Sequence, residues 1–273
     1  MEIYKRHMGN FAVALGKLAR AKTKQAFATP AQGMQERMRQ GIEADISTEG
    51  AWYNASFNEV GGRILGTRAE FNPLIDCAEQ AVESTRIGEF YLEGVLINGN
   101  PASEVLAEAA ERDAQKPIHK RRVADFGQMK THDVPADCFG DDDTIVFLAE
   151  SKAGANKYGS WLRKNAGVKE SRVRMQDIDG KDKSRGFWLG RLADDGRSDF
   201  YCDDRFLGNG GGSLFGVYES AEGTQKISGQ PRQGKQRRII SPNLSDMLKY
   251  SRPFVHSRDW KDFERGLRAK FEK

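Results

Sequence analysis

The sequence has few of the features that mark membrane, secreted or disulfide-bonded proteins. Only three of its 273 residues are cysteines (Cys77, Cys138 and Cys202), and they lie far apart, without the paired spacing of zinc sites. No apolar run approaches the ~20 residues that a membrane-spanning helix needs. The first residues lack the basic start and apolar stretch of a signal peptide. We therefore expect a cytoplasmic protein with reduced thiols.

Charge is distributed unevenly along the chain. Residues 1–40 contain eight basic and two acidic residues, and residues 221–273 contain thirteen basic and six acidic residues. Residues 41–220 contain 22 basic and 31 acidic residues. Basic ends suit contacts with phosphates, and an acidic centre can supply carboxylates, although an ordinary solvated surface is the alternative. Nucleic acid, either DNA or RNA, is therefore the partner that charge favours.

Hydrophobic periodicity and turn residues predict an α+β fold, in which a central mixed β-sheet is flanked by helices and both terminal segments are helical. We expect a basic helical segment over residues 1–50, an α/β core domain over 51–220, a flexible basic linker over 221–241 and a C-terminal helical segment over 242–273. The predicted helices are 2–27, 31–45, 52–66, 73–86, 101–113, 156–167, 243–250 and 257–271. The predicted strands are 89–97, 121–129, 141–152, 171–178 and 211–220, with a hairpin over 186–204.

Two acidic residues and a lysine suggest metal-dependent chemistry. The run Thr144–Leu148 is continuously apolar and favours a buried strand that ends in Glu150 and Lys152, which would point the same way. If 121–129 pairs with this strand, Asp125 lies beside Glu150, and two carboxylates at that distance suit Mg²⁺. Lys152 could then activate the attacking water, because the pKa of a buried lysine can fall.

At these residues the sequence resembles the PD-(D/E)xK nuclease superfamily, which includes many type II restriction endonucleases. The matching positions are Asp125, followed by Glu150 and Lys152 as Glu-x-Lys. The family often adds a glutamate from an earlier helix, and Glu59 stands in a suitable place. The resemblance implies a mixed sheet flanked by helices, Mg²⁺ held by Asp125, Glu150 and Glu59, and hydrolysis of phosphodiester bonds assisted by Lys152.

The sequence departs from that pattern in several places. Ala124 stands where the family has proline, and the gap between Asp125 and Glu150 is long for a hairpin. Asp133 and Asp137 are alternative candidates for the first carboxylate. A further interpretation is that Glu150 and Lys152 form an exposed pair at the end of a strand, which contributes at most about 1 kcal/mol.

Basic and aromatic residues provide candidates for nucleic-acid contacts. The basic candidates are Lys120, Arg121 and Arg122 before Asp125, Arg172 and Arg174 on one face of a strand, and Lys235, Arg237 and Arg238 in the linker. The aromatic candidates for base stacking are Tyr158, Trp161, Phe187, Trp188 and Tyr201, of which we expect about half to be core residues because strands bury alternate positions.

A second hypothesis needs no catalysis. The same basic ends, the aromatics and the glycine-rich stretch at 208–212 would suit a nucleic-acid-binding subunit of a ribonucleoprotein similar to CRISPR-associated subunits, or of a phage assembly. Such a chain could form a homodimer or join a multi-subunit complex.

Overall fold

The computed structural model describes residues 4–9, 11, 14–15, 18, 25–68, 71–76, 90–192, 198–204 and 213–218. The chain divides into two compact units, Met1–Ala221 and Glu222–Lys273, and the described residues all belong to the first. The predicted linker and C-terminal helices therefore lie outside the described residues. No helix in the described part of the chain is long and apolar enough to cross a membrane.

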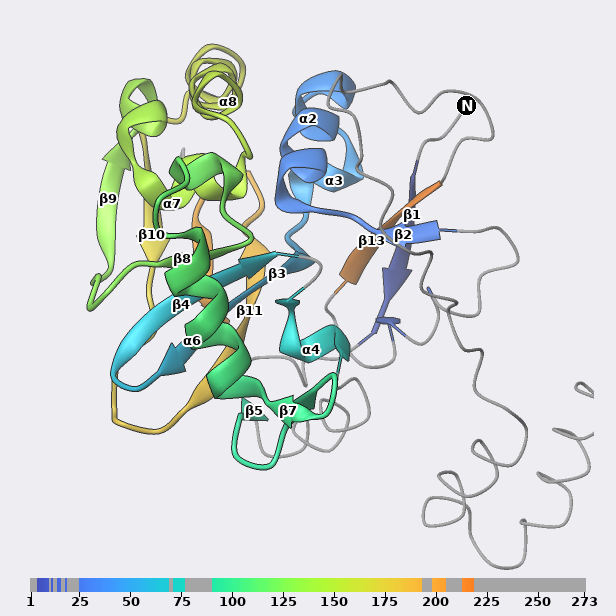
Figure 1. Cartoon of the computed structure of the whole chain (residues 1–273). Helices are drawn as coiled ribbons and strands as arrows, with labels where there is room; N and C mark the ends of the chain where they lie inside the picture. Colours follow the sequence, from blue (N-terminus) through green and yellow to red (C-terminus); the bar gives the residue numbers. More distant parts are fainter. Residues whose placement is uncertain are drawn as a thin grey trace, which may run out of the picture. The chain divides into compact units, whose positions relative to one another are not determined.

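A mixed β-sheet forms the centre of the first unit (Figure 1). Its main path runs β1-β13-β3-β11-β12-β10-β9, and β2, β4, β5 and β8 pair beside this path. The strands are β1 (Tyr4–Met8), β2 (Gln25–Phe27), β3 (Ala51–Val60), β4 (Arg63–Arg68), β5 (Phe90–Tyr91), β8 (Val123–Asp125), β9 (His132–Pro135), β10 (Glu170–Arg174), β11 (Lys183–Leu189), β12 (Phe200–Asp204) and β13 (Ser213–Tyr218). The pairs β10–β12 and β13–β3 are parallel, and the other pairs are antiparallel.

Helices cover the sheet, and the hydrophobic core forms two clusters. The helices are α2 (Pro30–Gln40), α3 (Asp45–Thr48), α4 (Pro73–Asp76), α6 (Ala102–Asp113), α7 (Asp143–Leu148) and α8 (Lys152–Asn165), with 3-10 helices η2 (Ile118–Lys120) and η3 (Ala136–Asp141). One cluster joins residues of α2, α7, α8 and η3 to one set of sheet residues, and the other joins α6 and α4 to a second set. A separate two-stranded sheet pairs β6 (Leu96–Ile97) with β7 (Asn100–Pro101). The predicted α+β fold with a central mixed sheet is confirmed.

Several predicted helices are present in the structure, and two of them, α2 and α8, follow clear capping residues. The side chain of Thr29 accepts a hydrogen bond from the Gln32 amide at the start of α2, and the side-chain oxygen of Gln32 accepts one from the Thr29 amide. Ser151 caps α8 by accepting a hydrogen bond from the Gly154 amide at 2.9 Å, so this helix begins four residues before its predicted start at residue 156. The hairpin predicted over 186–204 is present as the antiparallel pair β11–β12.

The predicted helix over 52–66 is wrong. These residues form the antiparallel strands β3 and β4, joined at Gly61 and Gly62, whose φ angles of +56° and +73° suit a tight hairpin turn. All ten residues of β3 are buried, so no alternation of exposed and buried residues identifies it as a strand. The glycine pair that weakened the predicted helix is the turn of a hairpin.

The predicted strand over 141–152 is also wrong. Asp142 accepts a hydrogen bond from the Ile145 amide at 2.8 Å and begins α7, and the apolar run Thr144–Leu148 is buried within that helix. A short buried helix and a buried strand have the same continuous apolar pattern. The predicted helix over 2–27 is wrong at both ends, where β1 and β2 lie, although Phe11, Ala14 and Leu18 are helical and buried.

Candidate functional site

The structure separates the residues of the predicted carboxylate–lysine site. Asp125 ends β8, which pairs with β4 and not with residues 143–152. One carboxylate oxygen of Asp125 accepts a hydrogen bond from Arg63 at 2.9 Å, and the other accepts one from the Gly127 amide at 2.7 Å. Asp125 is therefore paired with an arginine and stabilises a turn.

Glu150 and Lys152 lie on the surface between two helices. Glu150 is exposed, follows α7 and has a φ of +57°. Lys152 is the first residue of α8 and donates a hydrogen bond to Asp141 at 2.8 Å. This bond and the charge of Asp141 raise the pKa of Lys152, whereas activation of water by a lysine needs a lowered pKa. The alternative interpretation, an exposed pair of Glu150 with Lys152 at the end of a strand, is correct in the exposure of Lys152 but not in its partner, which is Asp141, or in the strand.

Glu59 lies on β3 and is fully buried. Its carboxylate accepts hydrogen bonds from the backbone amides of Asp179 and Gly180, at 3.1 and 2.7 Å, and lies 3.5 Å from the ammonium group of Lys183. These contacts hold the turn before β11 against β3. No group of three or more His, Cys, Asp or Glu side chains in the described residues is arranged to bind a metal ion. Magnesium binding remains a prediction of the sequence.

The basic candidates before Asp125 hold the end of α6. Arg121 donates to the backbone carbonyls of Lys116 and Ala114, both at 2.8 Å. Arg122 lies 3.6 Å from the buried carboxylate of Asp113 and stacks over Phe71. Lys120 is the last residue of η2 and is exposed. Lys235, Arg237 and Arg238 lie outside the described residues.

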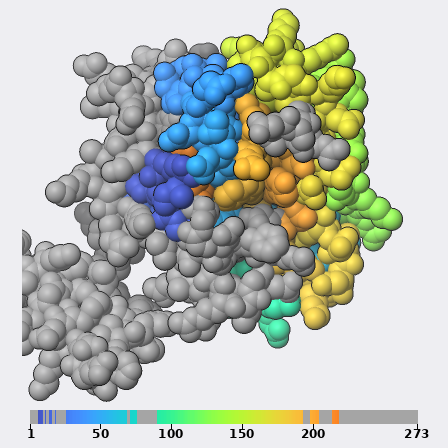
Figure 2. Space-filling view, turned by 180° about the vertical axis from the view of Figure 1, so that it is seen from behind, coloured from blue at the N-terminus to red at the C-terminus, as the bar shows by residue number. Residues whose placement is uncertain are grey.

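The best candidate for a functional site is a row of half-exposed and exposed side chains across four strands. We call Trp188, Tyr201, Arg174, Arg172 and Asp133 the recognition strip. Trp188 of β11 lies opposite Tyr201 of β12, Tyr201 lies opposite Arg174 of β10, and Arg172 lies opposite Asp133 of β9. Residues of β10, β11 and β12 reach the surface, in yellow to orange, in Figure 2.

The aromatic end of the recognition strip rests on the core. The indole of Trp188 meets the buried ring of Trp52 edge to face, with 4.9 Å between the ring centroids. A methyl group at Gly50 would overlap this indole, so glycine allows the close approach. A Cβ at Gly190 would lie 3.1 Å from the ring of Tyr201, which is a tight contact rather than an overlap. Burial and the charge of Asp199 raise the pKa of Tyr201, so its hydroxyl is neutral at neutral pH.

The arginines of the recognition strip are held by carboxylates. Arg172 donates to both oxygens of Asp133, at 2.8 and 3.0 Å. Arg174 donates to the nearly buried Asp199 at 3.1 and 3.2 Å, and its guanidinium lies 4.9 Å above the ring of Tyr201. The side chains of Arg172 and Arg174 each remain 36% exposed, so both are oriented and still accessible.

Part of this site was predictable from the sequence, in which Trp188, Tyr201, Arg172 and Arg174 are candidates for nucleic-acid contacts. The expectation that the two arginines share one strand face is confirmed, since Ser171 and Val173 are buried while both arginines are partly exposed. The expectation that other aromatic candidates are core residues is confirmed for Tyr158 and Phe187. Asp199 is not among the sequence candidates, because its proximity to Arg174 depends on the parallel pairing of β10 with β12.

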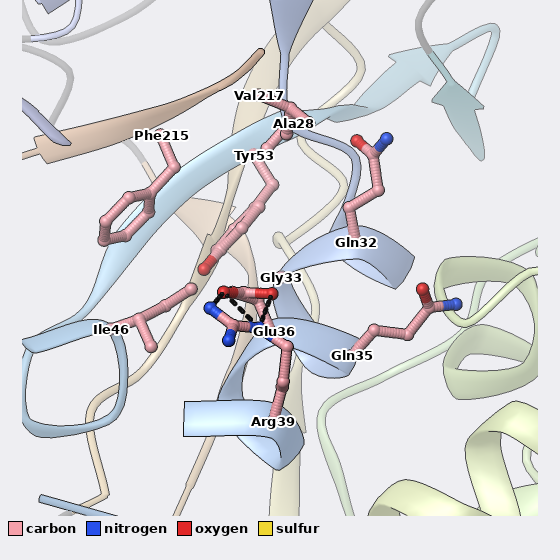
Figure 3. Close-up of a pocket in the computed structure, with 10 residues that line it drawn as sticks. All are labelled: Ala28, Gln32, Gly33, Gln35, Glu36, Arg39, Ile46, Tyr53, Phe215 and Val217. Atoms are coloured by element: carbon pink, nitrogen blue, oxygen red, sulfur yellow. Dashed lines mark hydrogen bonds and ion pairs between the residues drawn. The ribbon is translucent and has the colours of Figure 1, made fainter. Parts of the chain in front are cut away.

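A cavity of about 340 Å³ lies between α2 and the strands β3 and β13 (Figure 3). Ile46, Tyr53 and Phe215 line one side and are at most 2% exposed. Side chains of α2 line the other side, where Arg39 donates to both carboxylate oxygens of Glu36 at 2.9 Å. The apolar side of this cavity is thus formed by core residues, and the charged pair on its other side is internally satisfied, so the cavity is not the preferred candidate for a ligand site.

Comparison with known proteins gives evidence of the fold. No family model matches the chain, and no curated protein matches it. The structure is similar to a solved structure described as the accommodation of massive sequence variation in Nanoarchaeota by the C-type lectin fold. The TM-score is 0.50 at 10% sequence identity, and the match covers 80% of this chain and 96% of the other.

This likeness assigns the chain to the C-type lectin fold, and it assigns nothing beyond the fold. The C-type lectin fold is unrelated to the fold of PD-(D/E)xK enzymes. The nuclease function predicted from the sequence is therefore wrong. The separation of Asp125, Glu150 and Lys152 onto differently paired elements is consistent with that correction.

Proposed function

We propose that this chain is a non-catalytic recognition protein that binds a protein partner through the recognition strip. The observation that carries the proposal is the continuous row from the buried Trp52, through Trp188 and Tyr201, to Arg174. Tryptophan, tyrosine and arginine are the residues that most often dominate the binding energy of protein interfaces. Here they are anchored to the core at one end and accessible at the other.

The charges of the strip favour a protein over a nucleic acid. Arg172 is paired with Asp133, and Arg174 is paired with Asp199, so neither arginine offers an uncompensated positive charge. A phosphate backbone would have to compete with both carboxylates, and it would also be repelled by them. A protein surface with its own donors, acceptors and aromatic groups meets a mixed strip without that repulsion.

The likeness to the Nanoarchaeota structure supports the same proposal. That protein is described as accommodating massive sequence variation on the C-type lectin fold. A fold that tolerates variation can carry different surface residues on one core. Recognition proteins that share a fold differ from one another in such surface residues. In this chain the core side of the same strands is aromatic and fully buried, as Phe187 and Phe200 illustrate.

The proposal can be tested by selection against the immobilised full chain. A displayed library of random peptides and a pool of random single-stranded DNA and RNA would be presented in parallel. We expect peptides to be selected, and we expect Tyr201→Ser and Arg174→Met each to weaken their binding at least tenfold, because each change removes a central contact.

The matched control is Arg163→Met, since Arg163 also pairs with an aspartate on the surface but lies on α8. It should leave peptide affinity unchanged. Thermal unfolding would verify that the variants are folded. Peptides that bind all variants equally would overturn the strip as the site. Selection of nucleic acid alone, with strong salt dependence, would overturn the protein partner and support the nucleic-acid partner that the sequence predicts.

A further inference from the structure

His132, at the start of β9, is held by two hydrogen-bond acceptors. Its Nε2 lies 2.7 Å from a carboxylate oxygen of Asp142, and its Nδ1 lies 2.9 Å from the backbone carbonyl of Lys130. A neutral imidazole carries only one N–H, so it can satisfy one of these contacts. The imidazolium form donates to both, and the geometry therefore selects the protonated ring.

The contact with Asp142 connects β9 to the helix layer, and the contact with Lys130 orients the ring within its own segment. Asp142 also accepts a hydrogen bond from the Ile145 amide and so begins α7. Strand β9 ends the main path of the sheet and pairs with β10. His132 consequently ties a terminal strand to the N-terminus of a buried helix.

The next residue along β9 belongs to the recognition strip. Asp133 is held opposite Arg172, and its carboxylate receives both hydrogen bonds of that arginine. The placement of Asp133 depends on the position of β9, which His132 helps to fix. A change in the protonation of His132 can therefore alter the position of β9 and, through Asp133, the hydrogen bonds of Arg172.

The charged groups around His132 also favour its protonated form. Burial lowers the pKa of His132, but hydrogen bonds to Asp142 and Lys130 and the charges of Asp142 and Asp133 raise it more, and the net pKa lies above its ordinary value. On β10, Arg172 neutralises part of the charge of Asp133. On β12, the thiol of Cys202 is buried and its pKa is raised well above its ordinary value, so it is uncharged.

We propose that His132 is a pH-sensitive latch that regulates the recognition strip by fixing Asp133 and Arg172. This inference rests on the proposed function of the strip. Protonated His132 holds β9 against α7. Deprotonation removes one donor and leaves a ring nitrogen facing an acceptor, so β9 loosens and Arg172 loses its fixed partner.

The direction of the pH effect follows from the raised pKa. The stabilisation by His132 is fully present below its unfolded pKa of about 6.5 and is lost as the pH rises through the higher pKa of the folded state. We therefore expect the strip to be more ordered in mildly acidic solution than in alkaline solution.

Nuclear magnetic resonance of the full chain tests the latch without a partner. The imidazole signals of His132 should titrate above pH 6.5, and solvent exchange of the Arg172 Nε–H should accelerate as the pH rises through that pKa. In His132→Gln, the exchange should no longer show this step. The control His119→Gln, at a half-exposed position in η2, should keep it.

Two outcomes would overturn the latch. One is a His132 that titrates at or below 6.5. The other is an Arg172 signal that does not change as His132 titrates. Either result leaves peptide selection through the strip unaffected, whereas a failed selection leaves the titration unaffected, so the two proposals fail separately. If both hold, the affinity of a selected peptide should fall severalfold across the pKa in the natural chain and not in His132→Gln.

Discussion

Two arginines in this protein show opposite uses of the same side chain. Arg37 of α2 is fully buried and donates to the carbonyls of Ile46, Glu49 and Leu189 and to the hydroxyls of Tyr158 and Ser198. Arg174 of β10 is 36% exposed and contacts one carboxylate and one aromatic ring. The first connects five segments of the fold, whereas the second is oriented at the surface. Burial and the number of acceptors thus separate a structural charge from an available one.

The largest expected effect comes from removing the buried arginine. Arg37→Met keeps most of the volume but leaves buried carbonyl and hydroxyl groups without their donor, so we expect the free energy of unfolding to fall by about 3 kcal/mol or more. Urea denaturation measures the change. The matched variant Arg174→Met should cost less, about 1–2 kcal/mol, because the Arg174 guanidinium is partly exposed although its partner Asp199 is nearly buried. Similar losses in both variants would contradict the comparison.

A second buried charge sharpens the same comparison. In Glu59→Gln, the side-chain oxygen can still accept a hydrogen bond from the backbone N–H of Gly180. Buried Lys183, however, loses the negative charge of Glu59 and keeps only that of Asp179. We expect a loss of about 1–3 kcal/mol in the free energy of unfolding. Glu111→Gln, on the exposed face of α6, is the control and should have no effect. An unchanged urea midpoint for Glu59→Gln would show that this buried glutamate is dispensable.

Glu150 offers a smaller effect of opposite sign. Its φ of +57° is unfavourable for residues with a Cβ, and its side chain is exposed. Glu150→Gly should therefore raise the free energy of unfolding by about 0.5–1 kcal/mol. Glu150→Ala keeps the Cβ and should bring no such gain. Thermal unfolding distinguishes the two variants, and destabilisation by glycine would indicate that the carboxylate has a structural role.

The smallest effect is expected at Lys152. Its pair with Asp141 is exposed, with 64% and 71% of the two side chains accessible. Lys152→Met should leave the urea midpoint unchanged, because such a pair is well solvated. A large shift would show that this surface pair behaves like the buried charges.

Local signals explain which parts of the fold the sequence could predict. Helices α2 and α8 are preceded by the capping residues Thr29 and Ser151, whose side chains accept hydrogen bonds from backbone amides, and a sequence can show such capping patterns. All of strand β3 and residues Thr144–Leu148 of helix α7 are buried, so neither shows the alternation that distinguishes strand from helix. Their assignment depends on which neighbours cover them.

The candidate site was predictable to a similar extent. The alternation along β10 placed Arg172 and Arg174 on one face, which the structure confirms. Their partners Asp133 and Asp199 come from β9 and from the residue before β12, and no local pattern in the sequence connects these segments. The chemistry predicted for Asp125, Glu150 and Lys152 depended on a pairing of strands that does not form, because Glu150 and Lys152 do not lie on a strand.

The pairing of β1 with β13 has a consequence for how the chain folds. Tyr4 lies opposite Val217, and β13 also pairs with β2 and β3, so one late strand joins three early ones. Contacts between residues so distant in sequence slow folding, because the chain loses loop entropy before these contacts form. During synthesis, the edges of β1, β2 and β3 that pair with β13 remain unpaired until β13 has been made. We expect slow refolding, and a nascent chain that is prone to aggregate until residue 218 has left the ribosome.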